Sequence, residues 1–381
     1  MSISKYQFPT LIFSGTGARK EIISFLKEKN IKRPLLVTDQ GLVTLPIFKN
    51  YFSFLQSSGF DPQVYSGVKG NPVESQVIHG TQSFHEQKAD AIIGFGGGAA
   101  LDVAKAIALM TFHPGNLFDY EDGLTNGRPV DQKIPPLFAL PTTAGTGSEV
   151  GRSSVISDDL THQKKIIFSP RILPKVVFAD PELTQDLPSQ VTATTGLDAL
   201  THLIEAFLAQ GEHPICDGIA LEGIRLVSQS LETCVKTPHH LQARKDLLDA
   251  AMMGAIAFQK GLGLVHSCAH SLSTVCDLHH GLANGIMLPF ALEHNLSAVP
   301  EKFTRMANAA GLSNVNPEDF LSWIRDLKTK VQCPTTLCEV GVDESHLEKL
   351  VEFAFTDGCH PSGPRPVTKA DFENIFKKAL R

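Results

Sequence analysis

The sequence predicts two domains, an N-terminal α/β domain with a doubly wound, mostly parallel sheet and an all-α C-terminal domain. Its 381 residues, 42% of them hydrophobic, exceed the roughly 100–200 residues of one domain and can bury a large core. Up to about residue 185, short apolar runs alternate with stretches of helical spacing, whereas nearly everything from Val191 to Leu380 has helical periodicity. We therefore place the domains at residues 1–187 and 188–381.

The first half contains apolar runs rich in Val, Ile, Leu and Phe that end in Gly, Pro, Thr or Asp. We expect buried parallel strands at residues 34–39, 90–98, 136–143 and 176–180. Residues 45–59 and 73–88 have helical spacing, which gives the βαβ alternation of a doubly wound sheet. Residues 153–170 predict a hairpin instead, with Asp158 and Asp159 at its turn.

Composition and charge exclude several classes of protein. The net charge is -6 and no run of five or more Lys or Arg occurs, so nucleic acid is not an expected partner. The most apolar window, residues 89–110, carries two charged residues near its middle, which argues against a membrane span. The N-terminal apolar residues are interrupted by Pro9, Ser14 and Gly15, so they lack the continuous apolar run of a signal peptide, which predicts a cytoplasmic protein. The seven cysteines form no CxxC pair, which predicts reduced thiols.

Three consecutive glycines, residues 96–98, stand between a predicted strand and a predicted helix. Residues without a Cβ let the backbone approach a ligand, and the following helix directs free N–H groups at it, so a pyrophosphate is the expected guest. Gly94, Gly96 and Ala99 also match GxGxxG/A, which would require an acidic ribose contact about 20 residues later. Residues 112–124 contain acids but no second strand to present them.

Asp39 is a better candidate for the ribose contact, because it ends the predicted strand 34–39. A carboxylate there would repel a 2′-phosphate, which favours NAD over NADP. A turn-capping acid and a merely tight glycine turn remain the alternatives. After another predicted strand, Thr142, Thr143, Thr146 and Ser148 could line a cofactor groove, although the same composition is typical of an exposed loop.

The second half places acidic and imidazole side chains at helical spacing. Asp198 and His202 stand four residues apart and share one helix face, as do His266 and His270. His279 and His280 follow just before the next predicted helix. One carboxylate and three imidazoles would suit Fe(II) or Zn(II) with positions left for substrate.

Ordinary core histidines are the alternative to a metal site. A buried imidazole with unpaired nitrogens costs about 1–3 kcal/mol for each, so any of them could simply be hydrogen-bonded. Asp198 argues against this interpretation for the whole set, because it too lies on an apolar face and a buried carboxylate needs a cation. We expect Glu205 to lie on the solvated side of its helix.

Several motifs together resemble the iron-containing (group III) alcohol dehydrogenases. They are GGGAALDVAK (96–105), PTTAGTGSEV (141–150), ADPELT (179–184), TGLDALTHLIEAF (195–207) and GLGLVHSCAHSLS…HHGLANGIMLP (261–289). The likeness covers the whole chain, in order and spacing. It implies a dehydroquinate synthase-like architecture, with a dinucleotide-binding domain, a helical metal-binding domain and an active site in the cleft between them.

The resemblance also assigns roles to residues. Its metal ligands fall on Asp198, His202, His266 and His280, and its additional active-site histidine falls on His270, near substrate and nicotinamide. The cofactor contacts that it implies are Asp39, Asn71, Gly97, Gly98, Ala99, Asp102, Thr142, Thr143, Thr146, Ser148 and Lys164. His279 departs from the family, as does Ala99, which stands where Ser is usual and leaves one hydroxyl to the phosphates missing.

The function that the resemblance implies is reversible oxidation of an alcohol to an aldehyde or ketone, by hydride transfer to NAD beside a metal acting as a Lewis acid. It also implies Fe(II), with Zn(II) as the other choice, and a homodimer. Two other functions remain open. A lyase of the dehydroquinate synthase type would also use NAD and a metal, but it would need several basic residues to hold a phosphorylated substrate. A non-catalytic NAD or metal sensor would bind without turnover.

Overall fold

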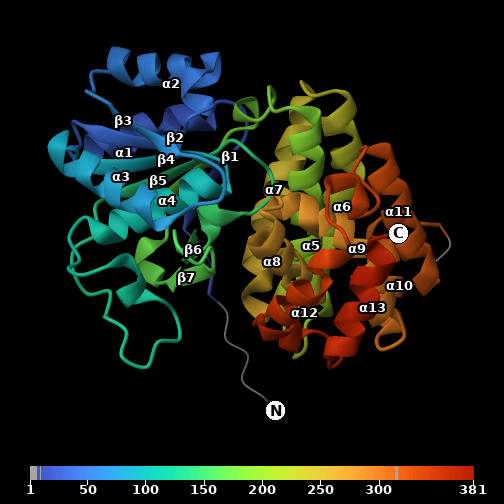
Figure 1. Cartoon of the computed structure of the whole chain (residues 1–381). Helices are drawn as coiled ribbons and strands as arrows, with labels where there is room; N and C mark the ends of the chain where they lie inside the picture. The colour runs from blue at the N-terminus through green and yellow to red at the C-terminus, as the bar shows by residue number, and fades with distance from the viewer. Residues whose placement is uncertain (1–6, 9, 314–315) are drawn as a thin grey trace. The chain divides into compact units, whose positions relative to one another are not determined.

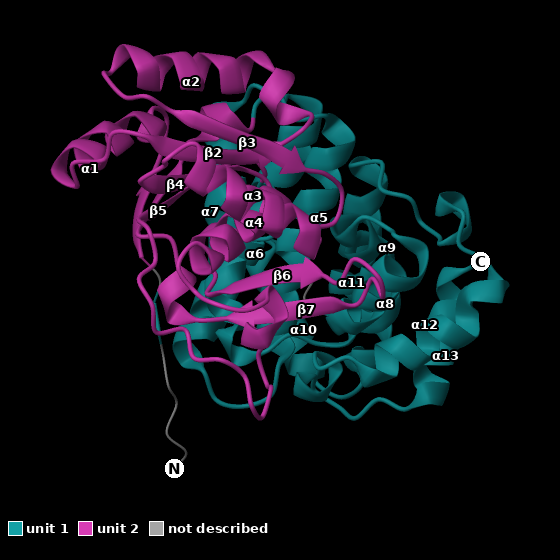
Figure 2. Ribbon diagram, turned by 60° about the vertical axis from the view of Figure 1, so that its left-hand side comes forward, with its two compact units in different colours: residues 1–8, 144–147, 185–381 teal, residues 9–143, 148–184 magenta. Residues whose placement is uncertain are grey.

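The computed structural model describes residues 7–8, 10–313 and 316–381, and it divides into two units (Figure 2). The α/β unit comprises residues 9–143 and 148–184. The helical unit contains the described residues within 144–147 and 185–381, together with residues 7–8. The short segment 144–147 therefore groups with the helices, a feature that the sequence did not indicate.

The α/β unit is built on a six-stranded parallel sheet (Figure 1). Its strands are β1 (Leu11–Ser14), β2 (Pro34–Asp39), β3 (Gln63–Val68), β4 (Ala91–Gly96), β5 (Leu137–Pro141) and β8 (Val176–Ala179). Their order is β1-β8-β5-β4-β2-β3, so β2 and β4 are neighbours. The predicted α/β fold class and its buried strands are confirmed.

Helices cover both faces of this sheet because its inner strands are apolar on both sides. They are α1 (Ile22–Glu28), α2 (Pro46–Ser57), α3 (Glu74–Glu86) and α4 (Gly98–Met110). Leu35 and Ile92 pack with side chains of α3 and α4, whereas their neighbours Leu36 and Ile93 pack with those of α1 and α2. Alternation along each strand thus divides the core of the unit into two layers.

Two strands escaped the sequence-based prediction. β1 and β3 lie at the two edges of the sheet, and only Val68 among their residues is buried. An edge strand need not be apolar throughout, so its sequence carries a weaker signal than an inner strand. The predicted hairpin is confirmed: β6 (Ser153–Ser157) and β7 (Lys164–Phe168) pair antiparallel, with Asp158 and Asp159 in the turn.

The helical unit confirms the prediction of an all-α second half (Figure 1). Its helices are α5 (Ser189–Leu208), α6 (Pro214–Lys236), α7 (Leu241–Ala257), α8 (Leu264–Cys276), α9 (His280–Leu296), α10 (Pro300–Ala309), α11 (Pro317–Lys330), α12 (Leu347–Thr356) and α13 (Lys369–Ala379). Among the residues that the structure describes, no single helix is both long and apolar enough to cross a membrane. Residues 241–260 and 264–276 are long and apolar enough only when taken together, and the chain bends by 106° between them.

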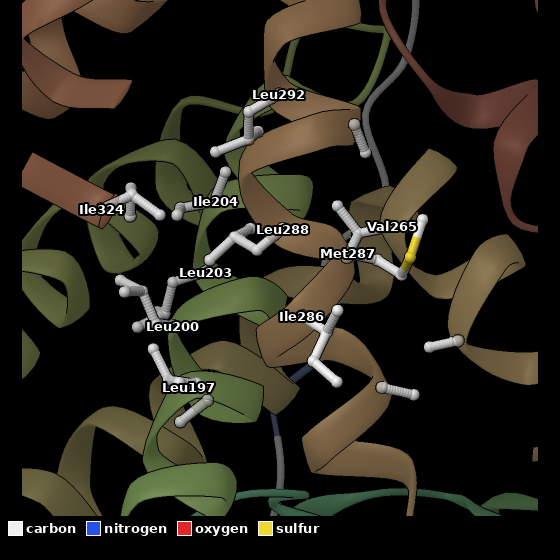
Figure 3. Packing of buried hydrophobic residues seen from close by; sticks show 14 of the residues in the cluster. Leu197, Leu200, Leu203, Ile204, Val265, Ile286, Met287, Leu288, Leu292 and Ile324 are labelled. Carbon is white, nitrogen blue, oxygen red and sulfur yellow. The ribbon is translucent and has the colours of Figure 1, made fainter. Parts of the chain in front are cut away.

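The core of this unit lies around α5 and α9. From residue 192 to residue 208 every residue of α5 is buried. In Figure 3, Leu288 of α9 lies beside Leu203 and Ile204 of α5, within one apolar cluster. At the end of α5, the ammonium group of Lys302 donates to the carbonyls of residues 207, 208 and 209. A cation there satisfies carbonyls that have no partner in the helix and complements its dipole.

Candidate metal centre and active site

Helix α5 brings the first two candidate ligands together. Asp198 and His202 are one turn apart, and His202 Nε2 lies 4.0 Å from Asp198 Oδ1. Both side chains are almost fully buried. The four-residue spacing read from the sequence therefore does place a carboxylate and an imidazole on the same helix face.

Helices α8 and α9 supply the other two. His266 lies in the first turn of α8, and His280 is the first residue of α9. Asp277 follows α8 in the left-handed conformation, with φ of 50°, where the chain leaves the helix. His280 Nε2 lies 3.6 Å from Asp198 Oδ1. One donor atom from each of Asp198, His202, His266 and His280 lies within 4.8 Å of the others.

The chemistry of these donors fits a divalent cation. One carboxylate oxygen and three imidazole nitrogens form a usual ligand set for Fe(II) or Zn(II). Burial lowers the pKa of His202 to about 4, so its ring is neutral at pH 7 and can offer a lone pair to a metal. Within the described residues, the ion-pair partners of Asp198 are His202 and His280. Neither partner is a Lys or Arg, so the buried charge of Asp198 still needs a cation, and a metal ion would supply it.

Asn284 of α9 lies among the same donor atoms. Its amide nitrogen donates to Asp198 Oδ1 at 2.7 Å, and it lies 3.4 Å from His266 Nε2 and 3.2 Å from His280 Nε2. The side chain is fully buried. Asn284 was not singled out from the sequence, where a single amide in an apolar helix gives no signal. It fixes the Asp198 carboxylate from the side of α9.

The expectation for Glu205 was wrong. Its side chain is 2% exposed, and its Oε2 accepts a hydrogen bond from His266 Nδ1 at 2.6 Å. The same carboxylate accepts from the backbone N–H groups of Gly263, Val265 and His266. Glu205 therefore caps the start of α8 and orients a candidate ligand, a role typical of the outer partners of metal-bound histidines. It lies on the same helix as Asp198 and His202, but α5 has no solvated face there.

His270 lies one turn after His266 on α8 and outside the group of four. Its ring stacks on that of His280, with 5.3 Å between centroids. Its Nδ1 is 2.8 Å from Asp357 Oδ2. His279, which precedes α9 at the N-cap position, is likewise not one of the four.

In the α/β unit, Asp39 and the glycine turn end neighbouring strands. Asp39 Oδ1 accepts from the backbone N–H groups of Gly41 and Leu42, so the turn-capping interpretation holds for this oxygen. A Cβ on Gly96 would lie 3.8 Å from Asp39 Oδ2, which places the second oxygen beside the glycines. The same Cβ would come within 2.6 Å of the Cβ of Ala100, so only glycine fits where β4 passes into α4.

Asp102 and Ser148 are joined to each other in the same unit. Ser148 Oγ donates to Asp102 Oδ1 at 2.5 Å, and it accepts from the ammonium group of Lys105 at 2.8 Å. Lys105 is 1% exposed, and burial lowers its pKa. Glu149 lies next to Ser148, and burial raises its pKa to about 7. Glu149 was not singled out from the sequence, because nothing local distinguishes a buried acid from an exposed one.

The other residues with an expected cofactor role are distributed over both units. Gly97, Gly98 and Ala99 lie at the start of α4, and the side chain of Thr143 lies 3.1 Å from a Cβ built on Gly97. Asn71 follows β3, Thr142 follows β5 and Lys164 begins β7. Thr146 belongs to the helical unit.

Comparison with known proteins identifies the family. A model described as iron-containing alcohol dehydrogenase matches residues 9–181, and one for the C-terminal part of the Fe-containing alcohol dehydrogenase family matches residues 192–380. The chain is 35% identical to the 4-hydroxybutyrate dehydrogenase of Cupriavidus necator, covering 94% of this chain and 96% of the relative. It is 33% identical to the NAD-dependent methanol dehydrogenase of Bacillus methanolicus, covering 99% and 100%.

A solved structure supports the same assignment. The crystal structure of a 1,3-propanediol oxidoreductase superposes with a TM-score of 0.93 at 34% identity, covering all of both chains. The family models match both halves of the chain, and the solved structure matches its fold. Both findings agree with the sequence motifs and with the buried group of donor atoms. The chain belongs to the iron-containing alcohol dehydrogenase family and is a metal-dependent, NAD-linked alcohol dehydrogenase.

Proposed function

We propose that this enzyme reversibly oxidises primary alcohols to aldehydes, with NAD as the hydride acceptor and Fe(II) as the metal. The observation that carries the proposal is the convergence of Asp198, His202, His266 and His280, whose donor atoms lie within 4.8 Å of one another. When bound, a divalent metal supplies Lewis-acid chemistry that lowers the pKa of a substrate hydroxyl. Zn(II) would suit the same donors, and it competes well wherever it is available.

The protein side chains contribute position and proton transfer. Asp198 supplies the negative charge of the site, and Glu205 holds His266 so that its Nε2 faces the other donors. We propose that His270 takes the hydroxyl proton of the substrate at Nε2 and passes it to solvent, since its side chain is 27% exposed. General-base assistance of this kind typically contributes about 10²–10⁴-fold to the rate.

For the cofactor we propose a site at the carboxyl edge of the sheet. Backbone N–H groups of Gly97, Gly98 and Ala99 at the start of α4 would hold the pyrophosphate. Asp39 Oδ2 would accept from the ribose hydroxyls, which disfavours NADP. Further contacts are proposed for Asn71, Asp102, Thr142, Thr143, Thr146, Ser148 and Lys164.

The substrate class follows from the relatives. The 4-hydroxybutyrate dehydrogenase, the methanol dehydrogenase and the 1,3-propanediol oxidoreductase are each named for a compound whose reacting hydroxyl is primary. We propose the same for this chain. We also propose that it works in the cytoplasm as a homodimer, because its seven cysteines are free thiols, and because the family resemblance implies a dimer.

The test combines metal analysis with an activity assay. Protein prepared anaerobically should contain about one iron per chain, and it should form NADH from primary alcohols and diols. His270→Ala should lower kcat by about 10²-fold or more while leaving the metal content unchanged. Loss of metal from this variant would make His270 a ligand and contradict its proposed role. Metal binding without turnover on any alcohol would favour a sensor.

A further inference from the structure

Helix α8 carries two histidines that are each hydrogen-bonded to a carboxylate through Nδ1. His266 is bonded to Glu205 at 2.6 Å, and His270 is bonded to Asp357 at 2.8 Å. The two acids come from different parts of the chain, since Glu205 belongs to α5 and Asp357 directly follows α12. One turn of α8 thus separates a candidate ligand from a candidate proton carrier, and the same kind of partner holds each of them.

The carboxylate of Asp357 is itself firmly held. Its Oδ1 accepts from Ser267 Oγ at 2.7 Å and from the backbone N–H of Cys359 at 2.9 Å. Ser267 Oγ in turn accepts from the backbone N–H of His360 at 2.9 Å. These bonds tie the segment after α12 to α8, and they leave Oδ2 directed at His270.

This arrangement selects one form of the His270 ring. Asp357 acts as a hydrogen-bond acceptor at both oxygens, because Oδ1 accepts from Ser267 and from the backbone N–H of Cys359 while Oδ2 lies 2.8 Å from His270 Nδ1. An ionised carboxylate only accepts hydrogen bonds, so the ring must carry a proton on Nδ1. A neutral ring with its proton on Nδ1 has a lone pair on Nε2 and can accept a proton there.

We propose that Asp357 is a positioning residue that holds His270 in the Nδ1–H form, with Nε2 kept as the proton acceptor. The proposal rests on the proposed role of His270 in alcohol oxidation. It adds a residue from the C-terminal segment to the machinery of the site, acting through His270 rather than on the substrate.

Asp357→Asn tests this directly. Ser267 and Cys359 both donate toward the Oδ1 position, so the amide oxygen should take that place and the amide N–H₂ should face His270. The ring proton should then move to Nε2, where it blocks proton acceptance. We expect kcat to fall by about 10²–10⁴-fold with KM changed by less than about threefold. Metal content should not change.

The ring form can be measured without turnover. ¹⁵N NMR of histidine-labelled, zinc-loaded protein distinguishes the two forms, and His270→Ala assigns the signal. Wild type should carry the proton on Nδ1 and Asp357→Asn on Nε2. Wild-type protein with the His270 proton on Nε2 would overturn the proposal, even if Asp357→Asn did not fold. If wild type were inactive on every alcohol, the proposed function would fail while this measurement still decided the role of Asp357.

Two controls separate positioning from general disturbance. Asp343→Asn makes the same change in an exposed Asp–His pair, where Asp343 Oδ1 lies 3.1 Å from His346 Nδ1, and it should leave kcat unchanged. Ser267→Ala removes a donor to Asp357 but keeps its charge, so kcat should fall less than about threefold. If Ser267→Ala lowered kcat as much as Asp357→Asn, the rate would depend on the position of the segment after α12 and not on the Asp357 carboxylate.

Discussion

The helical unit builds its polar site from side chains buried in helices, whereas the α/β unit builds the edge around Gly96 from turns, backbone N–H groups and small residues. In the first, each donor is a specific atom of Asp198 or a histidine, and two of the four side chains are held by a further partner, His266 by Glu205 and Asp198 by Asn284. In the second, the shape comes from the strand-to-helix turn, where a Cβ on Gly96 would collide with Ala100. One substitution should therefore abolish metal binding at the side-chain site, whereas one substitution at the backbone site should change the affinity for the cofactor only slightly.

Asp198→Asn should have the largest effect, because it removes the only carboxylate of the four-residue donor group while the side chain keeps its size. We expect the metal content to fall sharply and kcat/KM to fall by at least about 10³-fold, as several kcal/mol of Lewis-acid stabilisation are lost. Elemental analysis and NADH formation measure the two effects. Asp249→Asn on α7, where Asp249 pairs with Lys245 at 2.6 Å, is the control and should change neither. Full metal content in Asp198→Asn would refute the assigned ligand.

Glu205→Gln should weaken the metal site without abolishing it. The amide cannot accept from all the donors that surround it, so His266 loses its fixed orientation. Changes of this kind typically cost about 10–100-fold in metal affinity, which a chelator competition titration would measure. Glu232→Gln, in an exposed pair with Lys236, should leave affinity unchanged. Equal affinity in wild type and Glu205→Gln would mean that Glu205 only caps α8.

Glu149→Gln should change the pH dependence of stability in the α/β unit. Burial raises the pKa of Glu149 from 4.5 to about 7. The positive charge of Lys105 lowers this pKa, and the negative charge of Asp102 raises it further. The folded state then binds more protons than the unfolded state, so this group lowers stability as pH rises from about 4.5 to about 7. At roughly 1.4 kcal/mol per pKa unit, the loss is on the order of 3 kcal/mol.

The variant should therefore gain stability over wild type as pH increases through this range, which thermal unfolding at several pH values would detect. Glu86→Gln, at an exposed position where Glu86 accepts from Gln82, provides the matched control. A stability difference between Glu149→Gln and wild type that does not vary with pH would show that Glu149 stays ionised in the fold.

Ala99→Ser should have the smallest effect, and it tests the gradual character of the backbone site. Ala99 lies in the first turn of α4, and serine would add one hydroxyl toward the proposed phosphate position. One added hydrogen bond of about 1 kcal/mol should lower the Kd for NAD by about fivefold. Displacement of fluorescent NADH by NAD would measure this Kd. Unchanged binding would place the pyrophosphate away from the side chain of residue 99.

The sequence was a good guide where the signal is local. The four-residue spacing of Asp198 and His202 predicted a shared helix face, and the apolar run 34–39 predicted β2 with its ends correct. Edge strand β1 was missed because its apolar run, residues 11–13, is only three residues long, and β3 was missed because polar residues and a glycine interrupt its apolar ones. Glu205 was misplaced, since its helix is enclosed on every side and not on one face.

The sequence by itself determined the fold class and placed acidic and imidazole side chains on shared helix faces, because periodicity and helical spacing are local properties; the choice of four metal ligands came from the family resemblance and stays a prediction. Only the tertiary structure decided which acids hold the two histidines of α8. Glu205 lies 61 residues before His266 and Asp357 lies 87 residues after His270. Such pairs form through the packing of helices that are distant in sequence, and no spacing rule along the chain can anticipate them.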